Sequence, residues 1–191
     1  MSAVDVGAPP ADLTAEEERA LLGAAREAIA ARLEGRAPRL PSAEGGLLRP
    51  QGAFVSLHRR RDGELRGCVG TMRSEERLVA TVARMATAAA FEDGRFAPLR
   101  AKELPGLRLE ISVLSPLEPI RPEDVVVGRH GLLIDRGGRR GVLLPQVPVE
   151  HGWDRETFLV HLCAKAGLAA DAWRDPVAEL AGFTACVFAE E

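Results

Sequence analysis

The sequence lacks most of the short motifs by which enzymes are recognised. It contains no GxxxxGK phosphate loop, no GxGxxG run after a predicted strand, no GxSxG elbow and no HExxH zinc motif. His161 and Cys163 are two residues apart on a predicted helix, so their side chains point about 200° apart and cannot bind one metal ion together. The remaining candidate ligands are too scattered to indicate a site: Cys68, His58, His130 and His151. We therefore expect no structural metal and no cofactor.

The chain also lacks a long apolar run, a basic excess and an even set of cysteines. No run approaches the roughly 18 apolar residues of a membrane helix, and the N-terminus has no signal-peptide pattern. The net charge of −3 offers no overall attraction for nucleic acids or anionic membranes. The one basic run, Arg59 to Arg61, precedes Asp62 and is typical of a solvated hairpin end. Three cysteines in such a chain indicate a reducing cytoplasm, so we expect a cytoplasmic protein without membrane or nucleic-acid partners.

What is present indicates a soluble α+β protein with a mainly antiparallel sheet. The 191 residues are 46% hydrophobic and 28% charged, which is enough for one domain with a sizeable core. Residues 1–13 are predicted to be a flexible leader, and 14–191 a single domain. Capping and apolar spacing predict helices over 15–34, from an N-cap at Ser74 to about 91, and from a cap at Asp154 to about 166. Alternation and turn signals predict strands at 53–58, 64–72, 107–113, 125–127, 132–135, 141–144 and 183–188.

The most unusual stretch is Leu65-Arg66-Gly67-Cys68-Val69-Gly70-Thr71. In an extended chain Arg66, Cys68 and Gly70 point to one face, so a guanidinium lies beside a thiol. A nearby cation favours the thiolate, which is the form that attacks and binds. The two glycines remove bulk where another backbone or a ligand comes close. The competing interpretation is a small buried cysteine beside glycines that packing requires.

The turn at Asp62-Gly63 decides which residues lie beside Cys68. A two-residue loop places Leu57 opposite Cys68 and His58 on the other face. A three-residue loop with Gly63 in the left-handed conformation places Ser56 opposite Cys68 and His58 opposite Arg66. Only the second register gives the thiol polar neighbours, including a candidate base, and the sequence does not choose between them.

Four other positions are candidates for a site around Cys68. Arg95, in Asp93-Gly94-Arg95-Phe96, offers a charge at a helix end, although the favoured interpretation is a local salt bridge that fixes the turn. His130 begins a strand, where a histidine is more often a capping group than a catalyst. Gln146 and Glu150 flank Pro148 in a predicted rigid loop that presents an amide and a carboxylate. The alternative is a buried Gln146 that satisfies backbone groups.

Several stretches together resemble the AMMECR domain family, whose prokaryotic members are called AmmeMemoRadiSam system protein A. Departures from the family pattern are modest: Val69 replaces isoleucine, Gly94 and Ala97 replace prolines near Arg95, and Pro148 replaces alanine. The matching stretches follow the family order over about residues 14–188: Gly52–Leu57, Leu65–Thr71, Asp93–Leu99, Glu110–Leu117, Leu143–Val147, and Cys163–Leu168 with Trp173.

The resemblance implies an α+β fold with a larger and a smaller lobe and the cysteine motif near the cleft between them. It implies no settled reaction, but the family name records a genomic association with Memo-like and radical SAM proteins, which are the partners to expect. The first hypothesis is an enzyme or accessory subunit: Cys68 is the nucleophile, His58 the base, and Arg66, Gly67, Gly70, Arg95, His130, Gln146 and Glu150 bind a small or anionic ligand. The second is a binding or scaffold module in which the Arg-Gly-Cys run is structural.

Overall fold

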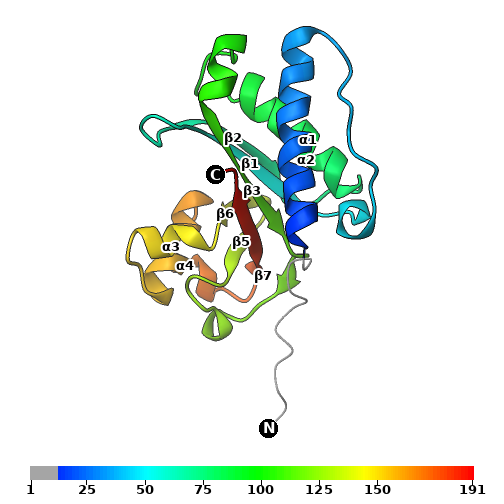
Figure 1. The fold of residues 1–191 in the computed structure, drawn as a ribbon. Coiled ribbons are helices and arrows are strands. Elements are labelled where there is room, and N and C mark those ends of the chain that lie inside the picture. The colour runs from blue at the N-terminus through cyan, green and yellow to red at the C-terminus, as the bar shows by residue number, and fades with distance from the viewer. Residues whose placement is uncertain (1–12) are drawn as a thin grey trace. The chain divides into compact units, whose positions relative to one another are not determined.

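The computed structural model describes residues 13–191, so the predicted leader lies outside the described residues apart from Leu13. The described chain forms two compact units, residues 13–114 with 186–191 (the larger lobe) and residues 115–185 (the smaller lobe). Two four-stranded antiparallel sheets and accompanying helices confirm the predicted α+β class (Figure 1).

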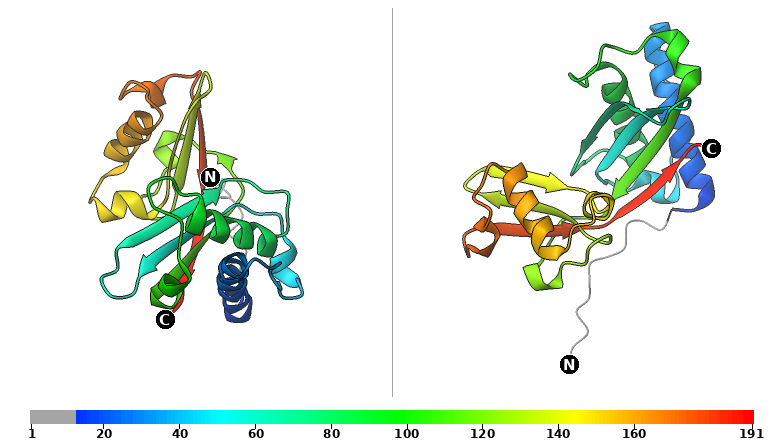
Figure 2. Two further views of the ribbon diagram at one scale, coloured as in Figure 1. Left: turned by 90° about the horizontal axis from the view of Figure 1, so that it is seen from above. Right: turned by 90° about the vertical axis from the view of Figure 1, so that its left-hand side faces the viewer.

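Two helices cover one face of the larger lobe's sheet, as Figures 1 and 2 show from three directions. α1, Ala15–Glu34, has the predicted capping box between Thr14 and Glu17 and ends at left-handed Gly35. α2, Leu78–Phe91, begins later than predicted. The Ser74 hydroxyl accepts from the Glu76 amide in the turn before the helix and from the Thr81 hydroxyl in its first turn. Ser74 is therefore not the N-cap, which is Arg77.

The sheet of the larger lobe has the order β2-β1-β3-β8. Its strands are β1, Ala53–Arg59; β2, Leu65–Thr71; β3, Leu107–Leu114; and β8, Ala185–Ala189. Short 3-10 helices lie beside it at Gly45–Leu48 and Ala101–Gly106.

The hairpin of β1 and β2 differs from both predicted turns. The Arg59 amide donates to the Glu64 carbonyl at 2.9 Å across the turn, and Gly63 has a φ of 73°. A bulge after Leu57 then shifts the pairing, so that Ser56 lies opposite Cys68 but His58 lies opposite Leu65. The Ser56 neighbour was predicted by the three-residue loop, whereas the pairing of His58 with Arg66 was wrong.

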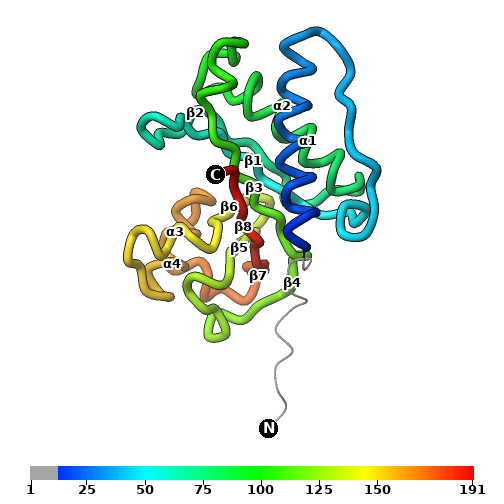
Figure 3. Tube along the Cα trace, in the orientation of Figure 1, coloured from blue at the N-terminus to red at the C-terminus, as the bar shows by residue number. Residues whose placement is uncertain are grey.

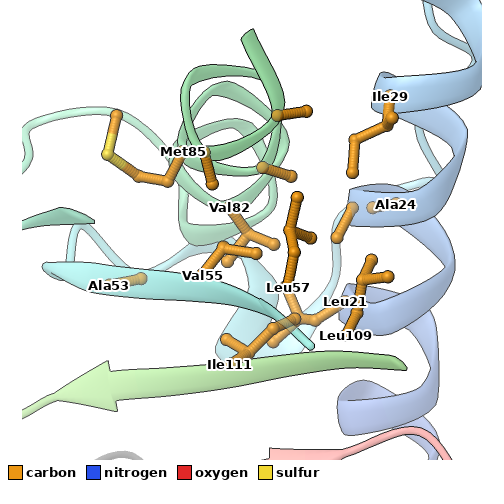
Figure 4. Close-up of a cluster of buried hydrophobic side chains, with 14 of the residues drawn as sticks. Leu21, Ala24, Ile29, Ala53, Val55, Leu57, Val82, Met85, Leu109 and Ile111 are labelled. Atoms are coloured by element: carbon orange, nitrogen blue, oxygen red, sulfur yellow. The ribbon is translucent and has the colours of Figure 1, made fainter. Parts of the chain in front are cut away.

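The core of the larger lobe fills the space between this sheet and the two helices (Figure 4). Alternation along the strands turns one set of residues inward, and these side chains meet apolar residues on both helices. Fully buried members include Leu21, Val55, Leu57, Leu109 and Ile111. The even-numbered residues of β1 therefore face away from the helices, and Ser56 is one of them.

The smaller lobe has its own sheet, in the order β4-β7-β5-β6, and its own core. Its strands are β4, Glu118–Pro119; β5, Gly131–Arg136; β6, Arg139–Leu143; and β7, Glu179–Phe183. Its helices are α3, Gln146–Glu150; α4, Arg155–Lys165; and 3-10 turns at Pro122–Asp124 and Ala172–Arg174. Asp154 caps α4 as predicted, through the Thr157 amide at 2.8 Å.

Two predicted strands need correction. Residues 125–127 are not a strand, because Val126 instead closes a turn with His130. The predicted strand over 183–188 is divided at Thr184 into β7 and β8, which belong to different sheets (Figure 3). Thr184 exchanges main-chain and hydroxyl hydrogen bonds with Ser115, which interrupts the strand.

Among residues 13–191, no helix is long and apolar enough to cross a membrane.

Candidate functional site

Cys68 lies on β2 with its half-buried side chain beside the hydroxyl of Ser56. The Ser56 Oγ donates to the Cys68 Sγ at 3.2 Å. The Cys68 amide points outward, away from β1, so the two residues form a non-hydrogen-bonded pair, the closer of the two antiparallel pairings. The register of the hairpin thus determines the polar contact of the thiol.

The side chains of Asp93 and Arg95 form hydrogen bonds with the main-chain amide and carbonyl of Cys68 on the outer edge of β2. The Cys68 amide donates to Asp93 Oδ2 at 2.9 Å, and Arg95 Nη2 donates to the Cys68 carbonyl at 3.3 Å. Arg95 also binds both carboxylate oxygens of Asp93, at 2.9 and 2.7 Å. The ion pair therefore takes the place of a neighbouring strand at this edge.

The ion pair of Asp93 and Arg95 shifts the pKa of both residues. The Arg95 guanidinium, helped by the amides of Cys68 and Arg95, holds the pKa of the Asp93 carboxyl well below its ordinary value. The pKa of Arg95 is raised, chiefly by its hydrogen bonds to Asp93. Asp93 is buried, but the Arg95 side chain is 59% exposed, and its Nη1 makes no hydrogen bond within residues 13–191. One edge of the Arg95 guanidinium thus faces solvent near Cys68.

The Arg66 side chain binds the segment that connects α2 to β3. Its Nε donates to Glu103 Oε1 at 3.0 Å and its Nη2 to the Ala97 carbonyl at 2.9 Å. The side chain is only 12% exposed, and the Phe96 ring lies against both Arg66 and Arg95, with centroids 5.8 and 5.4 Å from the guanidinium carbons. Arg66 also lowers the pKa of Glu103. Arg66 thus braces the loop that carries Asp93 and Arg95.

Gly67 and Gly70 allow two close approaches. A Cβ on Gly67 would lie 2.1 Å from the Ala89 carbonyl oxygen of α2, and a Cβ on Gly70 would lie 2.2 Å from the Phe54 ring. Packing alone therefore requires both glycines, as the structural interpretation of the run predicts. The Phe54 ring, opposite Gly70, borders the position of Cys68 on that face of the sheet.

The remaining predicted site residues lie elsewhere. His58 Nδ1 lies 3.2 Å from the Gly63 carbonyl oxygen at the hairpin turn. In the smaller lobe, His130 is buried, its Nδ1 accepts from the Val126 amide, and burial, followed by the charge of Arg129, lowers its pKa. Gln146 and Glu150 are the first and last residues of α3, so the predicted loop is a short helix.

No group of three or more histidine, cysteine, aspartate or glutamate side chains within residues 13–191 could hold a metal ion. Two arginines of the basic run are paired locally, since Arg59 and Arg61 bind Asp62 at 3.1 and 3.0 Å. Arg60 binds the Leu107 carbonyl at 3.0 Å.

Sequence reasoning missed two carboxylates that bind or face residues of the β1–β2 hairpin. Glu103 was not identified as the partner of Arg66, and Glu110 was not recognised as the residue opposite Ser56 on β3. The alternation of β3 already indicated that Glu110 points away from the core. Its partner, however, depends on the pairing of strands more than fifty residues apart.

Comparison with known proteins places these features in a family. The sequence model of the AMMECR1 family matches residues 22–188. The chain is 43% identical over 188 residues to Protein MK0488 of Methanopyrus kandleri, covering 94% of this chain and 91% of that protein. It is 43% identical over 149 residues to Protein PH0010 of Pyrococcus horikoshii, covering 73% and 72% of the two chains.

The crystal structure of uncharacterized protein PH0010 is also similar in fold, with a TM-score of 0.80 and 40% identity over 90% of each chain. The match of family model, relatives and fold extends over both lobes. The chain belongs to the AMMECR1 family.

Proposed function

We propose that this protein is an enzyme, or an accessory subunit of one, in which Cys68 acts as a nucleophile or covalent carrier. In this proposal Arg95 holds an anionic group of the substrate, and Asp93 positions Arg95. The observation that carries the proposal is the arrangement around the half-buried thiol: a hydroxyl 3.2 Å from the sulfur and a partly free guanidinium bound to the same residue's carbonyl.

The three cysteines provide an internal comparison for testing the proposal. Cys163 is fully buried in the smaller lobe, where burial raises its pKa. Cys186 is half-buried in the larger lobe, and its Sγ lies 3.9 Å from the Glu18 carboxylate. Of the two half-buried cysteines, Cys186 thus has a carboxylate near its sulfur, and Cys68 has a guanidinium bound to its carbonyl.

We predict that iodoacetamide alkylates Cys68 at least about tenfold faster than Cys186 or Cys163 near neutral pH, because a cation favours the thiolate. Mass spectrometry of peptides from the folded protein, sampled over time, measures the three rates. The variant Arg95→Gln should reduce the Cys68 rate, whereas Arg84→Gln on the exposed face of α2 should not. Equal or negligible labelling of Cys68 would contradict the proposal.

A binding or scaffold module is the second candidate function. It is favoured by the packing of Gly67 and Gly70 and by the ion pair of Arg66 with Glu103, which explain three residues of the run without catalysis. In this case Cys68→Ala would leave partner binding intact. Complementation of a deletion strain of the native host by Cys68→Ala separates the two functions, since full complementation favours the binding module.

The family resemblance adds Memo-like and radical SAM proteins as proposed partners in a shared pathway. Affinity purification of the tagged full-length chain from its native host, followed by mass spectrometry, tests this. Enrichment of either protein over an untagged control supports the pathway proposal, and enrichment of neither contradicts it.

A further inference from the structure

A row of side chains crosses three strands on the sheet face that points away from the helices. Ser56 on β1 pairs with Cys68 on one side and with Glu110 on the other. Their neighbours Val55, Leu57 and Ile111 are fully buried in the core, so alternation places the row on the opposite face. Cys68, Ser56 and Glu110 therefore line one path across the sheet.

Glu110 differs from the other partly buried carboxylates of the larger lobe. Asp93 accepts from Cys68 and Arg95, and Glu103 accepts from Arg66 and the Arg100 amide. The Glu110 side chain is 27% exposed, yet it accepts no hydrogen bond from residues 13–191, and its one ion pair there is a loose 3.8 Å contact with Arg108. A partly buried carboxylate with unused acceptors is suited to bind a cationic group.

The two ends of the row carry opposite charges. Arg95, with its free Nη1, lies at the outer edge of β2, and Glu110 lies two strands inward on β3. The Cα atoms of Cys68 and Glu110 are about 10 Å apart, from one close and one wide antiparallel pairing. Arg95 extends this path by about one strand spacing, to about 15 Å.

We propose that this row binds a short dipolar, peptide-like ligand, with its ammonium group at Glu110, its carboxylate at Arg95 and its middle over Cys68. An extended chain of four residues spans about 13 to 14 Å, which is close to the length of the row. The inference names the substrate class of the proposed thiol site, and Glu110 is its specificity-determining residue.

Calorimetric titration of the full-length protein with tetraglycine tests this inference. N-acetylation of tetraglycine should weaken binding about tenfold in the wild type, because it removes a charge-assisted contact with Glu110. In Glu110→Gln the free and acetylated peptides should bind equally, whereas amidation of the carboxyl end should still weaken binding. Glu110→Asp retains the charge and should retain the preference for the free amine.

Glu64→Gln is the matched control, since it removes the same charge from the exposed hairpin end outside the row. The comparison of two peptides within one variant is insensitive to a general loss of stability. Equal binding of free and acetylated tetraglycine to the wild type, or no binding at millimolar concentrations, would overturn the inference. If Cys68 is alkylated rapidly but no peptide binds, the proposed thiol function is supported and the peptide-binding inference is wrong. If the peptides bind selectively but Cys68 is inert, the inference is supported and the proposed thiol function is wrong.

Discussion

At the scale of single residues, the neighbourhood of Cys68 is built from contacts that leave little freedom. Its amide and carbonyl form hydrogen bonds with Asp93 and Arg95, and its sulfur accepts a hydrogen bond from the Ser56 hydroxyl. The adjacent Gly67 packs against the α2 backbone. The position of the thiol is therefore set by groups from β1, from α2 and from the loop that follows α2.

Gly67→Ala should destabilise the protein by about 3 kcal/mol, because the new methyl group would overlap the Ala89 carbonyl oxygen. Urea unfolding followed by far-UV circular dichroism measures this change in the free energy of unfolding. Gly94→Ala, in the adjacent loop where nothing lies within 4 Å of the added Cβ, is the control and should change stability little. Equal stability of the two variants would show that α2 shifts to accommodate the methyl group.

Asp93→Asn should cost about 1–3 kcal/mol at pH 7, because it removes a buried charge that binds Arg95 and the Cys68 amide. The pKa of Asp93 is lower in the folded than in the unfolded protein, so the unfolded chain binds more protons in acid. The contribution of Asp93 is thus complete above the ordinary aspartate pKa of about 4 and is lost as the pH falls below it.

Urea unfolding of the wild type and Asp93→Asn at pH 7 and pH 3 measures this dependence. The difference between the two proteins should shrink at pH 3. A constant difference would indicate that Asp93 acts through packing rather than through its charge.

At the scale of elements, the turn and the bulge of the β1–β2 hairpin determine which side chain lies opposite Cys68. Gly63 in the left-handed region closes the turn, and the bulge at Arg66 then brings Ser56 rather than Val55 opposite Cys68. Without the bulge, the turn would have aligned an apolar side chain with the cysteine.

Gly63→Ala should destabilise the protein by about 1 kcal/mol, because a Cβ is disfavoured at positive φ. Gly63→Asn should cost less, since asparagine tolerates this region. No atom lies within 4 Å of the added Cβ, so steric overlap does not contribute. The measurement is urea unfolding, and a larger cost for asparagine than for alanine would rule out this explanation.

At the scale of the whole molecule, Glu190 links residues of the larger lobe that are far apart in the sequence. Arg26 on α1 binds both Glu190 oxygens at 2.7 and 2.6 Å, and the Leu109 amide donates to the same carboxylate at 3.0 Å. Burial acts to raise the pKa of Glu190, but these hydrogen bonds outweigh it and the pKa is lowered. Residues more than 150 positions apart thus join in one network.

Glu190→Gln should destabilise the larger lobe by about 2 kcal/mol, because a charge-assisted pair becomes a weaker neutral contact. Glu191→Gln, whose side chain is exposed, is the matched control. The effect should be confined to one lobe, since each lobe has its own core.

Two optical probes distinguish the lobes in this experiment. Both tryptophans, Trp153 and Trp173, lie in the smaller lobe, whereas the two longest helices, α1 and α2, lie in the larger lobe. Glu190→Gln should therefore shift the urea transition seen by circular dichroism and leave that of tryptophan fluorescence in place. An equal shift of both transitions would show that the lobes unfold as one unit.

Local signals in the sequence were sufficient for much of the secondary structure and for the family. The capping box at Thr14, the cap at Asp154 and the alternation of β3 depend on residues within a few positions of one another, so their elements were predicted correctly. The resemblance of ordered stretches likewise identified the AMMECR1 family before any geometry was known.

Tertiary structure alone decided the environment of Cys68. The sequence placed the cysteine on a strand, but its contact with Ser56, its link to Asp93 and its row with Glu110 depend on a bulge and on strand pairing. The division of the last strand at Thr184 likewise depends on Ser115, far away in the sequence. Such features arise because hydrogen-bond partners distant in the chain must be satisfied together, and no local pattern encodes which partner each strand finds.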